Sequence, residues 1–284
     1  MTKSIKFSKS SKSSVKPKPR SIKSSTSNTM DFIYKGTAIE IGKETLGHIC
    51  LDSNDKIMEK KKECSLLYGE LLPEGLDKAL DSDHLDASNA KIIYDLGMGT
   101  GKAVFQIFLS NDYKNISKVI GVELSKARYR IAQRAGLRLV SEYSDLYELE
   151  SYEKDSHLKI SSTHKSKRCL ILKCDNLLNT ENIAKADIII CDTEFPKKLS
   201  EPLYDFFRNL SNKTRVMSYL NFDKFFTNNE MFKRMSINKQ KTDKFKTSWA
   251  TETGHRFYLW NVLEVDYKDV KKKTTVTKNL VKSR

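Results

Sequence analysis

The stretch that decides the fold of this 284-residue chain is Ile92-Ile93-Tyr94-Asp95-Leu96-Gly97-Met98-Gly99-Thr100-Gly101-Lys102. An apolar run ends in an acid, three glycines then alternate with other residues, and an apolar segment with helical spacing follows. This order predicts a buried strand, a tight loop and the N-terminus of a helix. Glycines at such a turn let a ligand approach the backbone, because no Cβ stands in the way.

Acids recur where the later apolar runs end. Glu123 follows Gly101 by 22 positions, close to the spacing of about 20 at which dinucleotide-binding folds place a ribose-binding acid. Strands that end in polar residues at one edge predict an open parallel sheet with a binding site along the carboxyl ends of its strands. The runs and their acids are 117–124 with Glu123, 168–175 with Asp175, and 186–193 with Asp192.

The glycine pattern favours S-adenosyl-L-methionine over a nicotinamide cofactor. NAD-binding chains show G-x-G-x-x-G, whereas this chain has an acid two residues before G-x-G-x-G, a pattern common in S-adenosylmethionine-dependent methyltransferases. That cofactor has no diphosphate, so we expect the loop to pass its methionine portion and carboxylates to take its ammonium and ribose groups. Another nucleotide-binding protein and a purely structural strand–turn–helix are the alternatives.

Basic charge is concentrated at the two ends of the chain, whose net charge is +15. Residues 1–24 carry eight Lys or Arg and no acid, and residues 268–284 carry seven Lys or Arg and one Asp. The Ser-, Lys- and Pro-rich start has too few apolar residues for a core, so we expect disordered basic tails over residues 1–30 and 268–284. Such tails favour nucleic-acid contact or nuclear import. A solvated leader or an organellar transit segment is the alternative.

The five cysteines show no metal-ligand spacing, and their number is odd. We therefore expect neither a disulfide framework nor a metal site, and we expect a reducing compartment, nuclear or else cytoplasmic. The sequence contains no run of 18 apolar residues, which predicts no membrane span and no membrane partner.

Between the tails, the chain divides into an N-terminal lobe over residues 31–90 and a core over residues 91–267. In the lobe we expect small helices or a hairpin, and then a helix with Pro73 in its first turn. In the core, residues 145–167 are polar and are expected to form a helix end and a surface loop.

Two further patterns concern the second helix of the core and the end of the chain. Lys126, Arg130, Arg134 and Arg138 recur every four residues after a predicted N-cap at Ser125. They indicate either a solvated face, where nearby acids reduce the repulsion between these cations, or a basic stripe that binds nucleic acid or an acidic protein. Residues 245–250 and 255–265 are expected to close the sheet as a hairpin that turns at residues 251–254.

Several segments between residues 62 and 265 together resemble the nucleosome-core histone lysine methyltransferases of the disruptor-of-telomeric-silencing type, which are not SET enzymes. The resemblance implies a seven-stranded, Rossmann-like class I methyltransferase sheet with a small N-terminal helical lobe. It also implies that residues 68–70 cover the methionine end of the cofactor, that Glu123 binds ribose, and that Lys102 stands where the family often has Gln. The implied cofactor-binding residues are Tyr68, Glu70, Asp95, Gly97, Gly99, Thr100, Gly101, Lys102, Glu123, Asp175 and Asn176.

The loop after the fourth predicted strand departs from this family, which has an Asn-containing tripeptide there. This chain reads Asp192-Thr193-Glu194-Phe195-Pro196, with acids in place of amides. A carboxylate orients an amine as an amide oxygen does, and it also attracts a lysine ammonium. We expect Phe195, Trp249 and Phe257 to wall a lysine channel, with Tyr68 near the sulfonium; ordinary core packing is the alternative for the aromatic side chains.

The sequence therefore predicts methyl transfer to a lysine of a core histone or another basic chromatin protein in the nucleus. Basic tails would contact nucleosomal DNA through its phosphates. The alternatives are an RNA or small-molecule methyltransferase on the same fold, and a cofactor-binding module with a degenerate catalytic loop. The expected catalytic residues are Asp192, Glu194, Phe195, Trp249 and Phe257.

Overall fold

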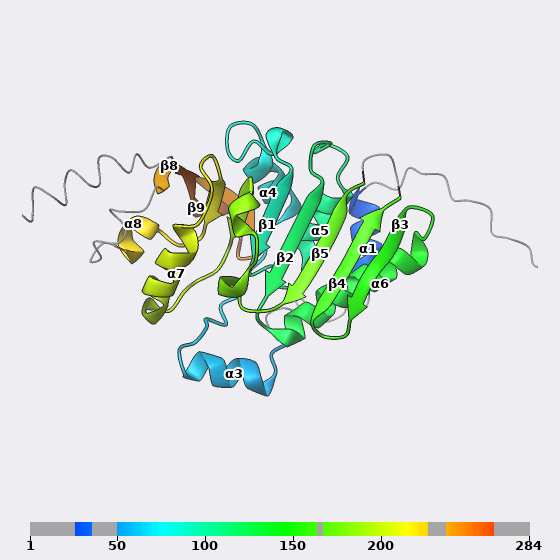
Figure 1. Ribbon diagram of the computed structural model, residues 1–284, viewed down its shortest axis with the longest axis horizontal. Helices are drawn as coiled ribbons and strands as arrows, with labels where there is room; N and C mark the ends of the chain where they lie inside the picture. Colours follow the sequence, from blue (N-terminus) through cyan, green and yellow to red (C-terminus); the bar gives the residue numbers. More distant parts are fainter. Residues whose placement is uncertain (1–25, 36–49, 164–166, 227–236, 264–284) are drawn as a thin grey trace, which may run out of the picture.

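The computed structural model describes residues 26–35, 50–163, 167–226 and 237–263. Within these residues the centre of the molecule is a nine-stranded sheet in the order β3-β4-β5-β2-β1-β6-β7-β9-β8 (Figure 1). Both predicted basic tails lie outside the described residues, apart from the last part of the first. The strands are β1 Ile92–Leu96, β2 Lys118–Glu123, β3 Tyr147–Glu153, β4 His157–Ser162, β5 Cys169–Cys174, β6 Ile188–Cys191, β7 Arg215–Ser218, β8 Ile237–Thr247 and β9 Ala250–Val262.

Helices cover both faces of this sheet. Short 3₁₀ turns lie mainly in the connections that follow the strands. The α-helices are α1 Thr26–Tyr34, α3 Ser53–Lys60, α4 Pro73–Leu80, α5 Lys102–Leu109, α6 Lys126–Glu142, α7 Ser200–Phe207 and α8 Phe222–Phe225. The 3₁₀ turns are η1 Ala87–Asn89, η2 Leu177–Asn179, η3 Ile183–Lys185 and η4 Lys197–Leu199.

The five central strands β5, β2, β1, β6 and β7 are parallel; β2, β1, β6 and β7 have buried side chains on both faces, whereas β5 has fully buried side chains on one face only. Because successive side chains of a strand point to opposite faces, Ile188 and Ile190 pack in the core beneath α1, α4, α5 and α6. Ile189 packs in a second core beneath α7 and α8. Burial on both faces explains why these strands read as continuous apolar runs rather than as alternating ones.

The predicted seven-stranded class I methyltransferase sheet is confirmed as the strands β5-β2-β1-β6-β7-β9-β8. The prediction for residues 145–167 is wrong, because β3 and β4 form an antiparallel hairpin that extends the sheet beyond β5. Leu158 and Ile160 are fully buried against Gly136 of α6. The polar residues around them dominate the composition and hide this two-residue alternation.

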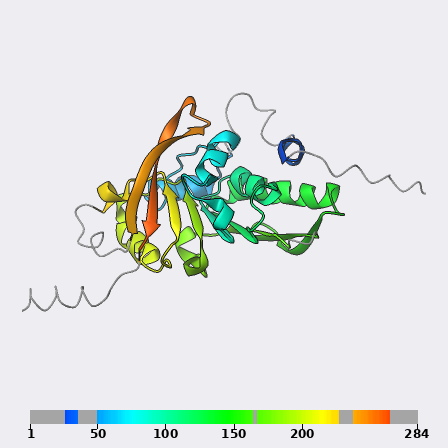
Figure 2. The ribbon, with the colours of Figure 1, turned by 90° about the horizontal axis from the view of Figure 1, so that it is seen from above.

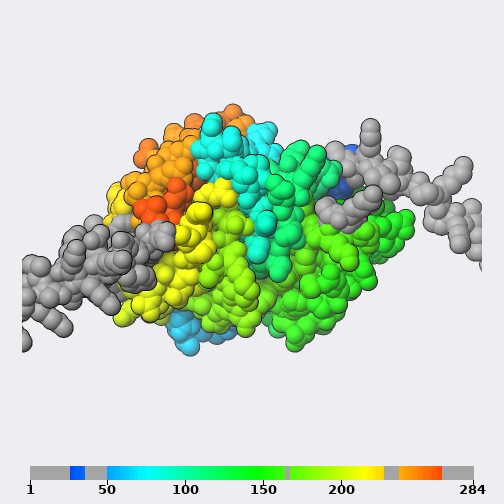
Figure 3. Space-filling model, turned by 45° about the horizontal axis from the view of Figure 1, so that its top comes forward, coloured from blue at the N-terminus to red at the C-terminus, as the bar shows by residue number. Residues whose placement is uncertain are grey.

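The closing hairpin is confirmed, but its turn lies at Ser248 and Trp249 rather than at residues 251–254. Gly254 lies inside β9 with a φ of +66°, facing the backbone of Phe245 where the pairing register shifts. It therefore serves a β-bulge and not the hairpin turn. The hairpin lies beside α4 (Figures 2 and 3), so it reaches the N-terminal lobe.

The N-terminal part of the described chain is helical where it was expected to be a tail. The expected boundary at residue 30 falls within α1, which packs against α5 and α6. Two local predictions are confirmed: Pro73 is the first residue of α4, and the Ser125 hydroxyl accepts a hydrogen bond from the Arg128 amide at the start of α6. No helix among the described residues is long and apolar enough to cross a membrane.

Candidate active site

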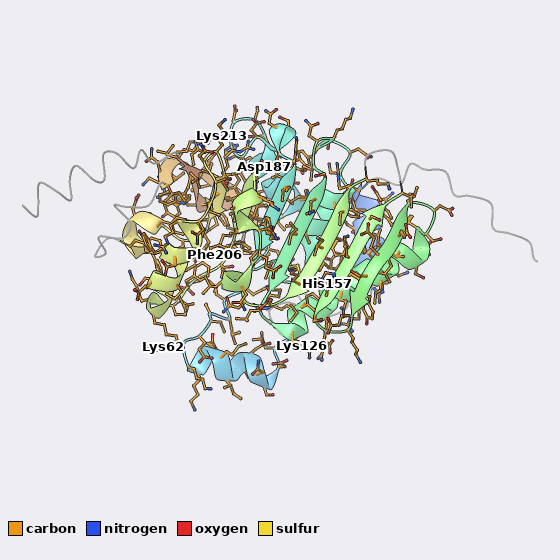
Figure 4. The ribbon with its side chains drawn as sticks, in the orientation of Figure 1. Lys62, Lys126, His157, Asp187, Phe206 and Lys213 are labelled. Carbon is orange, nitrogen blue, oxygen red and sulfur yellow. The ribbon has the colours of Figure 1, made fainter. Side chains whose placement is uncertain are left out.

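The acids that end the parallel strands meet at one edge of the sheet. Asp95 of β1 is in register with Gly121 of β2 and Ile190 of β6. Two residues further along, Glu123 is the last residue of β2, and Asp192 directly follows β6. Helix α3 lies below this edge, between the labelled Lys62 and Lys126 (Figure 4). The labelled Asp187 and Lys213 mark the opposite edge.

The glycine loop is held in place by the acid of the neighbouring strand. One carboxylate oxygen of Glu123 accepts a hydrogen bond from the Gly99 amide at 2.8 Å, and the other accepts one from Ser125 at 2.7 Å. Gly97 has a φ of +89°, and a Cβ added there would lie 2.1 Å from the Thr193 hydroxyl oxygen. No other residue fits at position 97 without displacing the loop that follows β6.

Two cavities of about 770 and 380 Å³ open at this edge. The cavities meet at Tyr68, Gly69, Gly97 and Asp192, which line both. Of the predicted site residues, Gly99, Glu123, Asp175, Asn176, Glu194 and Phe195 line only the larger cavity, and Glu70, Asp95, Thr100 and Lys102 line only the smaller.

The loop at residues 68–70 covers the glycine loop through a dense polar network. The Tyr68 hydroxyl donates to Glu70 Oε1 at 2.6 Å and lies 3.1 Å from the Thr100 hydroxyl, which also donates to Glu70. The Lys102 ammonium forms an ion pair of 2.6 Å with the other Glu70 oxygen. Burial and the negative charge of Glu70 raise the pKa of Tyr68, so its hydroxyl keeps its proton.

Hydrogen bonds join this covering loop to the β8–β9 hairpin of the sheet. The Ser248 amide donates to the Glu70 carbonyl at 2.8 Å, and the Ser248 hydroxyl accepts from the Glu70 amide at 3.1 Å. The Trp249 ring lies over Gly69, where an added Cβ would come within 1.7 Å of it. Two motifs far apart in the sequence, residues 68–70 and 247–249, are therefore one structural unit.

Arg128 is a buried site residue that the sequence did not indicate. Its guanidinium lies 4.5 Å from the centre of the Tyr68 ring, donates to the Leu66 carbonyl at 2.8 Å, and lines the larger cavity. The four cations of the predicted stripe are largely engaged elsewhere: Lys126 and Arg130 pair with Asp155, and Arg138 donates to the end of α1. The only signal for Arg128 was its place three residues after the N-cap.

Asp95 and Asp192 are the strongest electrostatic feature of the site. Burial raises the pKa of Asp95 to about 8, helped by the negative charges of Asp192 and Glu123, and burial raises the pKa of Asp192 to about 7. Within the described part of the chain, neither carboxylate accepts a hydrogen bond from a protein group. A cation between them would offset the free-energy cost of burying two carboxylates that have no hydrogen-bond donor.

The expected aromatic channel is only partly assembled. Phe195 is 8% exposed and lines the larger cavity. Phe257 is fully buried in the core and lines neither cavity, and Trp249 is 45% exposed at the hairpin tip, outside both. Tyr219 lies near the acids instead. Burial raises the pKa of its hydroxyl, and the nearby negative charges of Glu194 and Asp192 raise it further.

The polar groups of the two cavities fit a nucleoside joined to a positively charged amino acid. Glu123 and Asp175 offer carboxylates in the larger cavity, and Asp95 and Asp192 offer unpaired carboxylates where it meets the smaller one. The described residues contain no group of three or more His, Cys, Asp or Glu side chains that could hold a metal ion.

This fold and this site define a class I S-adenosylmethionine-dependent methyltransferase. The model of one family, the histone methylation protein DOT1, matches residues 47–262. The chain belongs to the DOT1 family, and its cofactor is S-adenosyl-L-methionine. No curated protein is significantly similar to it in sequence.

Solved structures with this fold are distant in sequence. A putative class I S-adenosylmethionine-dependent methyltransferase from Listeria monocytogenes has 12% identity and a TM-score of 0.46, covering 85% of this chain and 70% of that one. Trm1 from Pyrococcus horikoshii, in complex with S-adenosyl-L-methionine, has 9% identity and a TM-score of 0.45, covering 69% of this chain. The match spans 57% of the Trm1 chain.

Proposed function

We propose that this protein transfers a methyl group from S-adenosyl-L-methionine to a lysine of a core histone or another basic chromatin protein. The observation that carries the proposal is the position of Asp192. Its carboxylate lies where the two cavities meet, and it has no hydrogen-bond donor in the described part of the protein. An unpaired acid at this point favours an acceptor that arrives as a cation.

The cofactor is held by groups at the carboxyl edge of the sheet. Glu123 and Asp175 are placed to bind ribose and the adenine amino group in the larger cavity. Asp95 and Asp192 attract the positive charges of the methionine portion, and the glycine loop lets that portion approach the backbone. When bound, the cofactor supplies a methyl group on an already activated sulfonium, so the protein's task is alignment.

The acceptor lysine must lose a proton before it reacts, because a free lysine titrates near about 10.4. Glu194 is exposed at the cavity mouth and accepts a hydrogen bond from the Ser65 hydroxyl at 2.9 Å. It is placed to attract the ammonium. Asp192, with a pKa of about 7, is suited to take the proton, while Phe195 excludes water beside it.

The partners and the compartment follow from the same proposal. The basic tails predicted at residues 1–30 and 268–284 would contact nucleosomal DNA through its phosphates, and such binding weakens steeply as salt is added. The protein would then act in the nucleus. Deleting residues 1–24 should lower DNA affinity at low salt and flatten its salt dependence, without changing cofactor affinity.

Radiolabelled S-adenosyl-L-methionine tests the function when it is offered with nucleosomes, free histones and RNA in parallel. We expect label on a histone lysine, located by mass spectrometry of the product. Asp192→Asn keeps the shape of the side chain but cannot take the proton, so it should lose most of the activity, and Asp192→Ala should lose at least as much. Label on RNA alone would overturn the lysine assignment. Cofactor binding without transfer to any acceptor would indicate a binding module with a degenerate loop.

A further inference from the structure

The glycine loop has a support that comes from outside the methyltransferase core. The hydroxyl of Tyr34, the last residue of α1, donates a hydrogen bond of 2.8 Å to the carbonyl oxygen of Thr100. Tyr34 is 3% exposed, so this contact is shielded from water. It crosses 66 residues of sequence and joins the first helix of the described residues to the loop that holds the cofactor.

The contact fixes one peptide plane of the loop. The amide of Gly101 belongs to the same peptide unit as the Thr100 carbonyl, and it donates to the Met98 carbonyl at 2.9 Å. A peptide unit is planar, so holding its oxygen on one side and its N–H on the other sets its orientation. Gly101 has a φ of +85° and caps α5, so this peptide decides how the loop enters the helix.

Helix α1 is itself held firmly enough to act as a support. The Arg138 guanidinium donates to the carbonyls of Ile33, at 3.3 Å, and Lys35, which lie at the C-terminal end of the helix, where carbonyls have no donor within the helix. Ile33 is fully buried, and the Tyr34 ring packs edge-on against Phe105 of α5 with centroids 6.1 Å apart. The anchor therefore rests on packing and on a guanidinium, not on the hydroxyl alone.

The same ring also contacts the cation of the cofactor site. The Lys102 ammonium lies 5.9 Å from the centre of the Tyr34 ring while it pairs with Glu70 of the covering loop. Tyr34 thus touches both residues that flank Gly101. Burial and the charge of Glu70 raise the Tyr34 pKa, so the hydroxyl remains a donor throughout the working pH range.

We propose that Tyr34 is a positioning residue that holds the Thr100–Gly101 peptide in its cofactor-binding orientation, which makes α1 part of the cofactor site. The inference rests on the cofactor site and not on the identity of the methyl acceptor. It predicts that α1, which precedes the family match over residues 47–262, is needed for cofactor affinity.

The test compares Tyr34→Phe with Ile33→Val by calorimetric titration of S-adenosyl-L-methionine, with no acceptor present. Tyr34→Phe keeps the ring and removes only the hydrogen bond, so Kd should rise about three- to tenfold. Ile33→Val loosens the packing of the same helix without touching the loop, and its Kd should stay within about twofold of the parent protein. The ¹⁵N and ¹H amide shifts of Gly101 should move in the first variant only.

An unchanged Kd in Tyr34→Phe would overturn the proposal. So would equal increases in both variants at matched thermal stability, because these would show a general effect of loosening α1. Neither outcome depends on turnover, so a failed search for a histone substrate leaves this test intact.

Discussion

Lys102 and Glu70 form an ion pair, with 2.6 Å between Nζ and Oε2, that locks the first turn of α5 to the loop covering the cofactor site. Only 31% of the lysine side chain and 10% of the glutamate side chain are exposed. Lys102 stands where the resemblance implies a glutamine, and its ammonium supplies the charge of this ion pair.

Replacing Lys102 with methionine should raise the Kd for S-adenosyl-L-methionine about tenfold. The change leaves Glu70 as a buried acid without its cation, and such a loss is costly in a poorly solvated site. Lys246→Met is the matched control, because Lys246 forms an ion pair of 2.7 Å with Glu74 on the exposed side of the same lobe. Its Kd should not change; equal effects of the two variants would contradict a local role for Lys102.

Cofactor affinity should rise with pH. The cationic cofactor binds the ionised form of the Asp95 and Asp192 pair, whose pKa values are about 8 and about 7. Its Kd should therefore fall between about pH 6 and about pH 9. Titrations at several pH values check this, with uncharged 5′-methylthioadenosine as the control ligand whose Kd should stay flat. A cofactor Kd that is independent of pH would show that the pair does not face the cation.

The same two acids should make the protein less stable as the pH rises. Their folded-state pKa values lie above the ordinary aspartate value, so the folded protein keeps protons that the unfolded chain has already lost. The free energy of unfolding should then decrease from about pH 4 to about pH 8. Asp192→Asn removes one of the two contributions, and its denaturant midpoint should fall less over this range than that of the parent protein.

Phe195→Leu should lower kcat about tenfold while the cofactor Kd stays within about threefold, because Phe195 lines the larger cavity beside Glu194. Phe257→Leu is the control: this residue is fully buried and lines neither cavity. It should cost about 1–3 kcal/mol of stability and leave kcat unchanged. Unchanged turnover in Phe195→Leu, with cofactor binding intact, would remove Phe195 from the acceptor channel.

Asp55→Ala should speed dissociation of the cofactor severalfold and cost about 2 kcal/mol of stability. Asp55 of α3 is 1% exposed and accepts a hydrogen bond of 2.8 Å from the Ser125 hydroxyl, which ties α3 to the start of α6. The loop after α3 lines the larger cavity. Asp52→Ala is the control, because it removes only the N-cap of α3. Stopped-flow release rates distinguish the two; equal rates would show that α3 does not retain the cofactor.

The cofactor side of the site was predictable from sequence because its chemistry is local to the strand ends. Asp95 lies in β1 two residues before Gly97, and Glu123 ends the strand paired with β1, so the parallel register alone brings them together. The acceptor side was less predictable. Trp249 and Phe257 were expected to wall the lysine channel, yet Trp249 packs over Gly69 and Phe257 packs in the core.

The sequence by itself indicated the parallel strands, the glycine loop and the class of cofactor, because each depends on contacts within a strand–loop–helix unit or between neighbouring strands. Only the tertiary structure decided what surrounds that loop. Tyr34 of α1 reaches the glycine loop itself, whereas Arg128 of α6 and Ser248 of the closing hairpin contact the covering loop at residues 68–70, over separations that no periodic pattern records. The physical reason is that side-chain packing between distant elements depends on how helices and strands lie in space, whereas the glycine loop depends on backbone conformations that its own residues permit.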